Sequence, residues 1–146
     1  MTRNFLITLA LGGLMLAASG CDDKPVLPAN LPAEIQTFVK QTFPNQTITY
    51  AEKDVEWMFW DKYDVTLADG TMISFDTDNV WDKVESRMAP IPATLIPANI
   101  ATYVATNFPA VPIIKIDKES YGYEVELATD LDLKFNHQGA LMEMDD

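Results

Sequence analysis

The chain has 146 residues, of which 22 are acidic and 10 are basic, so its formal net charge is −12 at neutral pH, and it contains a single cysteine. This charge excludes the nucleic-acid-binding class, because contact with phosphates requires clustered lysine and arginine side chains. A basic protein partner or bound cations are compatible with the charge. So is an acidic surface that serves solubility alone.

Residues 1–20 have the pattern of a secretory signal peptide. Arg3 provides a positive start, and residues 5–18 form an apolar run shorter than the ~20 residues that a membrane-spanning helix needs. Small residues at positions 18–20 precede Cys21. This arrangement resembles a bacterial lipobox, in which the cysteine is acylated and becomes the first residue of the mature chain.

An exported lipoprotein is therefore expected, held in the cell envelope by lipid on Cys21 and facing either the periplasm or the cell surface. The alternative is a free thiol in an ordinarily secreted protein. Residues 21–30 are expected to form a tether, because they are charged, contain two prolines and lack apolar periodicity.

The rest of the chain carries one pattern twice. The segment 31–44 matches the segment 96–109, and the same correspondence continues to Lys53 and Lys118. Beyond this pair the correspondence shifts, so that Tyr63 matches Tyr123. The first copy therefore has five additional residues, near positions 55–62.

Such repetition predicts two similar units with a shared core. Their bounds are residues 31–85 for repeat 1, 86–95 for the linker and 96–146 for repeat 2. The place where the two copies differ is the best candidate for a property specific to this protein.

Each copy begins with an apolar pattern of helical spacing. The positions are Leu31, Ile35, Phe38, Val39 and Phe43 in the first copy and Ile96, Ile100, Tyr103, Val104 and Phe108 in the second. Pro32 and Pro97 fit the first turn of a helix, where a missing N–H is tolerated, and Pro44 and Pro109 prevent continuation. Two amphipathic helices of about three turns are predicted.

After each helix, apolar and polar residues alternate between turn signals such as Asp69-Gly70, which is the pattern of half-buried strands. Four strands are expected in each copy, at residues 47–52, 63–67, 72–75 and 80–85, and at residues 112–117, 121–127, 131–135 and 140–144. These elements predict an α+β fold with both helices on one face of a shared antiparallel sheet. The other face would be solvated or covered by a partner.

The order of these signals resembles that of the PepSY-like proteins, also called putative beta-lactamase-inhibitor-like. The matching residues are Leu31-Pro32, Phe43-Pro44, Tyr63, Val65, Leu67, Asp69-Gly70, Ile73, Phe75-Asp76, Asp78, Trp81, Ile96-Pro97, Phe108-Pro109, Tyr123, Val125, Leu127, Phe135 and Gly139. Asn79 replaces a turn glycine of the family and can adopt the same backbone conformation. The resemblance implies a fold similar to the beta-lactamase inhibitor protein, a protein or peptide partner, and inhibition of a hydrolase as the proposed activity. It implies no catalytic residue.

The additional residues of the first copy suggest a binding site. If the alternation stays in step with Val65, then Met58 and Trp60 join Lys62 and Asp64 on the open face, where aromatic and methionine side chains ringed by charge are typical of a protein-binding centre. The partner-binding residues expected are Trp57, Met58, Trp60, Lys62 and Asp64. The alternative is that the tryptophans belong to the core or to a sheet edge, or that a bulge exchanges the two faces.

Other chemistry finds less support in the sequence. His137 lies in a predicted turn without a nucleophile nearby, and neither a cofactor nor a metal site is expected. Five aspartates could suggest calcium, but they lack the glycine and terminal glutamate of an EF-hand, so turn chemistry is preferred. These are Asp76, Asp78, Asp82, Asp130 and Asp132.

Two alternative functions remain open. One is binding of a small molecule or cation in a pocket, and the other is hydrolysis by a carboxylate pair such as Asp61 and Asp64.

Overall fold

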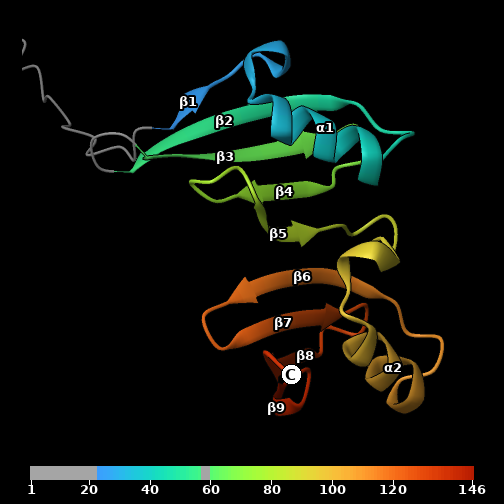
Figure 1. The fold of residues 1–146 in the computed structure, drawn as a ribbon. Helices are drawn as coiled ribbons and strands as arrows, with labels where there is room; N and C mark the ends of the chain where they lie inside the picture. Colours follow the sequence, from blue (N-terminus) through green and yellow to red (C-terminus); the bar gives the residue numbers. More distant parts are fainter. Residues whose placement is uncertain (1–22, 57–59) are drawn as a thin grey trace, which may run out of the picture.

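The computed structural model describes residues 23–56 and 60–146. Within these residues the chain forms two α-helices and a nine-stranded antiparallel sheet, whose strands lie side by side in the order in which they occur along the chain. Figure 1 shows this order from β1 at one edge to β9 at the other. The α+β class predicted from the sequence is confirmed.

A helix followed by four strands occurs twice. The first half contains α1 (Ala33–Thr42), β2 (Ile48–Glu56), β3 (Trp60–Leu67), β4 (Met72–Phe75) and β5 (Trp81–Glu85). The second half contains α2 (Ala98–Asn107), β6 (Ile113–Glu119), β7 (Gly122–Leu127), β8 (Asp132–Asn136) and β9 (Leu141–Asp145). The short strand β1 (Lys24–Pro25) and the 3₁₀ helices η1 (Pro28–Asn30) and η2 (Ala93–Leu95) complete the described elements.

Both α-helices begin and end where their prolines require. Pro32 and Pro97 are the N-cap residues, and each helix ends directly before the phenylalanine of a Phe-Pro pair, Phe43 or Phe108. The buried residues of each helix are one turn apart, as the apolar spacing predicted. No helix in the described part of the chain is long and apolar enough to cross a membrane.

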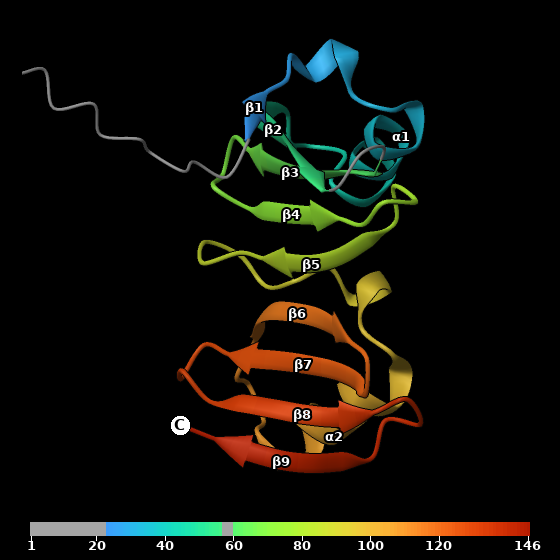
Figure 2. The same ribbon diagram turned by 90° about the vertical axis from the view of Figure 1, so that its left-hand side faces the viewer.

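The two helices cover the same face of the sheet (Figure 2). One buried row crosses this face through cross-strand partners, with no side chain more than 1 % exposed. It consists of Ala51, Val65, Ile73, Val84, Ile116, Val125 and Leu133. Because the row continues from β5 to β6, the two halves share one core and fold together.

The predicted tether needs a correction. From Lys24 onward it lies against the sheet edge, since Lys24 pairs with Lys53, Pro25 pairs with Glu52, and the Val26 N–H donates to the Ala51 carbonyl at 2.8 Å. Residues 24–30 therefore belong to the folded domain. Sequence periodicity could not reveal this, because a two-residue strand forms only where a neighbouring strand supplies its hydrogen bonds.

The five additional residues of the first half lengthen the β2–β3 hairpin. Its last described pairs are Val55 with Asp61 and Glu56 with Trp60, whereas the β6–β7 hairpin ends at Glu119 and Gly122. The predicted first strand, residues 47–52, was therefore too short at its C-terminal end. The predicted linker also contributes to the fold, because the Ile91 N–H donates to the Ile113 carbonyl at 2.9 Å.

Candidate functional site

The face of the sheet opposite the helices carries two continuous rows of cross-strand partners, and no helix of the described chain lies over it (Figures 1 and 2). The Glu52 row consists of Glu52, Asp64, Ser74, Lys83, Asp117, Glu124, Lys134 and Glu143. The Tyr50 row consists of Tyr50, Thr66, Met72, Glu85, Lys115, Glu126, Asp132 and Asp145. Strand alternation predicts this open face, and both rows flank the buried row that begins at Ala51.

Only one stretch of these rows is free of charge over three neighbouring strands. Tyr50, Thr66 and Met72 follow one another on β2, β3 and β4, and Tyr50 is 46 % and Met72 49 % exposed. Large apolar side chains with this exposure within a charged face are typical of a contact surface. These three residues are called the Tyr50 patch below.

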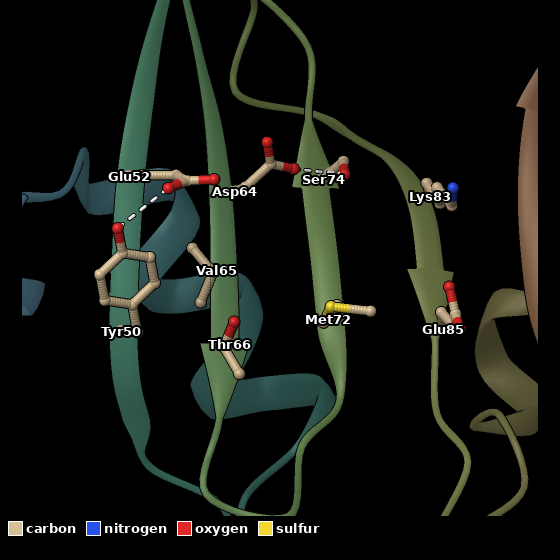
Figure 3. A pocket seen from close by; sticks show the side chains of 9 residues that line it. All are labelled: Tyr50, Glu52, Asp64, Val65, Thr66, Met72, Ser74, Lys83 and Glu85. Carbon is tan, nitrogen blue, oxygen red and sulfur yellow. Dashed lines mark hydrogen bonds between the residues drawn. The ribbon is translucent and has the colours of Figure 1, made fainter. Parts of the chain in front are cut away.

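The Tyr50 patch lies in a depression of about 210 Å³. Figure 3 shows that the residues of the Glu52 row stand along one side of the patch, while Glu85 lies beyond Met72. The charged side chains of the lining are Glu52, Asp64, Lys83 and Glu85. The depression therefore combines an uncharged floor with three carboxylates and one ammonium group.

Two of these carboxylates are oriented by neighbouring hydroxyl groups (Figure 3). The Tyr50 hydroxyl donates to Glu52 Oε2 at 2.9 Å, and the Ser74 hydroxyl donates to Asp64 Oδ1 at 2.5 Å. The hydrogen bond to Glu52 also raises the pKa of Tyr50, so its hydroxyl remains a donor at neutral pH. Each of these two carboxylates is thus fixed in orientation and can still accept hydrogen bonds from another group.

The single lysine of the lining lies beside a carboxylate of the second half. Lys83 and Asp117 are cross-strand partners at the junction of β5 and β6. Burial raises the pKa of Asp117, and the nearby Lys83 charge opposes that rise. Lys83 therefore stabilises Asp117 as well as facing the depression.

A second, more polar depression of about 260 Å³ adjoins the first along the Glu52 row. Its lining includes Asp54, Lys62, Asp64, Asp82 and Asp117. Burial, and then the charge of Asp76, raise the pKa of Asp82. Its Oδ1 atom is buried, and no hydrogen-bond partner for it lies among the residues that the structure describes.

Two predicted site residues border these depressions. Lys62 and Asp64 lie on the open face, as the alternation predicted. Trp60 begins β3 opposite Glu56, and only its backbone is described. Trp57, Met58 and Cys21 lie outside the described residues. A role of the five predicted residues in partner binding, and lipidation of Cys21, stay predictions.

The structure separates Asp61 and Asp64, the carboxylate pair considered for hydrolysis. Asp61 lies on the helix side, where its Oδ2 is 2.5 Å from Lys53 Nζ, whereas Asp64 lies on the open face, so the two carboxylates cannot flank one bond. His137 Nε2 lies 3.0 Å from the Ser120 carbonyl in the turn where it was predicted.

The acidic turns use their carboxylates locally. Asp76 Oδ1 accepts hydrogen bonds from the N–H groups of Asp78 and Val80, both at 2.9 Å, and Asn79 has a φ of 62°, the left-handed conformation expected for it. No group of three or more histidine, cysteine, aspartate or glutamate side chains in residues 23–56 and 60–146 is arranged to hold a metal ion.

Tyr50, Thr66 and Met72 are not among the site residues predicted from the sequence. The sequence holds a signal for them, because alignment of the two halves matches them with Lys115, Glu126 and Asp132. All three positions change from uncharged to charged between the halves.

Comparison with known proteins assigns the family. The sequence pattern of the PepSY-like family, described as "putative beta-lactamase-inhibitor-like", matches residues 19–58 and 61–143. The chain belongs to this family. A search of the curated proteins found no match.

Solved structures of Bacteroides proteins share the fold of this family member. A "putative periplasmic protein" of the DUF2874 family from Bacteroides vulgatus is 34% identical, with a TM-score of 0.79 and coverage of 86% of this chain and 98% of its own. A "putative calcium-regulated periplasmic protein" from Bacteroides thetaiotaomicron is 31% identical, with the same TM-score and coverage. A "putative periplasmic protein of unknown function" from B. vulgatus is 25% identical, with a TM-score of 0.79 and coverage of 85% of this chain and 99% of its own.

Proposed function

We propose that this protein is a non-enzymatic protein of the bacterial cell envelope that binds a protein or peptide on the open face of its sheet. The Tyr50 patch is the centre of the site, and Lys62 and Asp64 lie at its border. The observation that carries the proposal is the uncharged stretch of Tyr50, Thr66 and Met72 in a row whose other members are all charged, with Tyr50 and Met72 exposed. Apolar and aromatic side chains ringed by charge are the usual anatomy of a protein-binding centre.

The family description supports a partner of this kind, since a beta-lactamase-inhibitor-like protein would act by occupying a hydrolase. We also propose that the two halves are copies of one unit. The matching sequence patterns support this, and so do the irregularities of register, which fall between Ile48 and Tyr50 in β2 and between Ile113 and Lys115 in β6. Residues at matching positions of the two halves can then be compared, and a difference between them indicates a property of one half.

Export and lipid attachment at Cys21 are part of the proposal. The neighbours described as periplasmic support export, and the signal pattern before Cys21 supports acylation. Because β1 begins at Lys24, the folded domain would start within ~11 Å of the lipidated residue, which is the reach of three extended residues. Mass measurement of the protein extracted from the envelope tests this: an unmodified chain that still begins at Met1 would exclude lipidation.

Crosslinking in the native envelope followed by affinity capture tests the binding face. We expect the double variant Thr66→Glu/Met72→Asp to lose the crosslinked partner, because it introduces a charge at each of two positions of the patch. The fold should tolerate both residues, since Glu126 and Asp132 occupy the matching positions in the second half.

A matched control adds the same charge elsewhere. Thr37→Glu/Gln41→Asp places two carboxylates on exposed positions of α1, and it should retain the partner. The variant Met58→Ala/Trp60→Ala examines the site predicted from the sequence in the same assay. Equal recovery of every partner with the Thr66→Glu/Met72→Asp variant and with the wild type would refute the proposed site.

A second candidate function is cation binding, which the description of one neighbour as calcium-regulated favours. Against it, the Asp76 carboxylate already accepts two backbone N–H groups through Oδ1. Calorimetric titration with calcium decides between the two. Tight binding that disappears in the Asp76→Asn/Asp78→Asn variant would establish the second candidate.

A further inference from the structure

The depression at the Tyr50 patch has the size of one side chain. Its volume of about 210 Å³ falls below the ~300–1,000 Å³ typical of pockets that hold small organic ligands. It is also shallow, because Tyr50 and Met72 remain about half exposed within it. A single side chain that projects from a partner's surface fits these dimensions better than a free small molecule does.

The charge of the lining favours a cation. The carboxylates of Glu52, Asp64 and Glu85 line the depression together with one ammonium group, that of Lys83, which also stabilises Asp117. Arg87 compensates Glu85, because its Nε donates to Glu85 Oε1 at 3.1 Å, so the excess of negative charge comes from Glu52 and Asp64. The hydroxyl groups that donate to Glu52 and Asp64 are neutral and do not offset their charge. The depression therefore has a local excess of negative charge beside apolar surface.

The second half shows a cation in the matching place. Lys115 stands at the position of Tyr50, directly after the same irregularity of the strand register, and its Nζ lies 3.5 Å from Glu124 Oε1. Glu124 itself matches Asp64 in the correspondence between the copies. Burial opposes the charge of Lys115, but the carboxylates of Glu124 and Asp132 outweigh it and raise its pKa.

The first half thus has the carboxylate of this arrangement without its lysine. Tyr50 brings no charge to the position of Lys115, and Thr66 and Met72 leave space in front of it. We propose that the depression receives a cationic side chain of the partner, an arginine in particular, in the place that Lys115 holds in the second half. This inference rests on the proposed function, because it specifies the chemistry of the partner at the same site.

Arginine fits the lining better than lysine does. Its planar guanidinium group can stack on the Tyr50 ring and form paired hydrogen bonds to a carboxylate. Its aliphatic stem can pack on Met72 and Thr66. Lysine has a compact ammonium group, which satisfies a carboxylate but gains less from an aromatic face.

Blocked seven-residue peptides test the inference on the full chain in detergent. The central residue is arginine, lysine or citrulline, which is a neutral analogue of arginine, and the flanking residues are identical neutral ones. Binding is followed through the ¹³C-methyl signal of Met72, which the Met72→Leu variant assigns. We expect the arginine peptide to shift this signal and to bind roughly tenfold tighter than the citrulline peptide, with lysine between them, because hydrogen bonds between charged groups are the stronger ones.

Tyr50→Lys supplies the missing cation from the chain itself. It should lower the affinity for the arginine peptide to that for the citrulline peptide without unfolding the protein, since Lys115 is accepted at the matching position. The control Gln41→Lys makes the same change of charge on an exposed position of α1 and should leave the affinity unchanged. Added salt should weaken the binding of the arginine peptide and leave the binding of the citrulline peptide unchanged.

The outcomes separate this inference from the proposed function. Equal affinities for arginine and citrulline, or no response of the Met72 signal to millimolar arginine peptide, overturn the cation inference. The proposed function then still stands if Thr66→Glu/Met72→Asp releases the envelope partner. Retention of that partner by the double variant overturns both.

Discussion

The two halves of the molecule present different surfaces on the same backbone. Their strands have matching irregularities of register, and both bury an apolar row against one helix. On the open face, however, the halves differ at three matching positions. The first half has Tyr50, Thr66 and Met72, where the second half has three charged residues. The difference teaches that the buried face specifies the fold, while the open face is available for a specific partner.

The hairpin ends differ as well, and here the difference is steric. Gly122 of the short β6–β7 hairpin has a φ of 147°, and an added Cβ would collide with the Phe135 carbonyl oxygen. Lys62 stands at the matching position of the longer β2–β3 hairpin, where a full side chain is accommodated. The five additional residues thus relieve a constraint that the second half meets with glycine.

The largest effect is expected from Gly122→Ala. We expect it to lower the free energy of unfolding by roughly 2–4 kcal/mol, because the backbone must shift to avoid the Phe135 carbonyl. Lys62→Ala, the matched change in the first half, should cost less than about 1 kcal/mol. Urea denaturation measures both. Similar losses for the two variants would contradict the steric explanation.

An intermediate effect is expected at the junction between the halves. Lys118 Nζ lies 3.7 Å from the centroid of the Trp81 ring and donates to the Trp81 carbonyl at 2.8 Å, so it joins β6 to β5. Its counterpart Lys53 pairs with Asp61 instead. Lys118→Met should cost about 1–2 kcal/mol, through the lost cation–π contact and hydrogen bond.

Lys53→Met is the matched control for this junction. It removes a surface ion pair, which is worth less than about 1 kcal/mol and is screened by salt. Denaturation in low and high salt distinguishes the two lysines, because the effect of Lys118→Met should persist in high salt. Loss of both effects in high salt would argue against a structural role for Lys118 at the junction.

The smallest effect is expected at the bulge of β5. Asp82 occupies the place that Met142 holds in β9, and burial raises the pKa of Asp82. Since its pKa is higher in the folded chain than in the unfolded chain, protonation favours the folded state. The corresponding stability is present at low pH and is lost as the pH rises through the raised pKa.

Asp82→Asn should therefore raise the melting temperature at pH 7, and its advantage should shrink as the pH falls toward the raised pKa. Asp78→Asn, in the exposed turn before β5, is the control and should not show this pH-dependent advantage. Thermal melts across this pH range provide the measurement. If the gain in melting temperature of Asp82→Asn stayed constant with pH, the raised pKa of Asp82 could not be its cause.

Much of the fold could be predicted because its signals are local. Pro32 and Pro44 mark the ends of α1, and alternation around Val65 identifies the buried side of β3. The site was harder to predict, since its residues are recognisable only as neighbours. Tyr50 and Met72 are far apart in the chain and lie on strands separated by β3. The same reason explains the error over residues 24–30, whose hydrogen bonds come from β2.

The sequence by itself determined where the helices begin and end, which side of each strand is buried and how the two halves correspond. These properties follow from the spacing of apolar residues and prolines along a continuous chain. Only the tertiary structure decided which exposed side chains form the Tyr50 patch, and that a carboxylate stands there without the lysine of the second half. Both depend on cross-strand register, which brings together residues from separate strands through hydrogen bonds that no local pattern encodes.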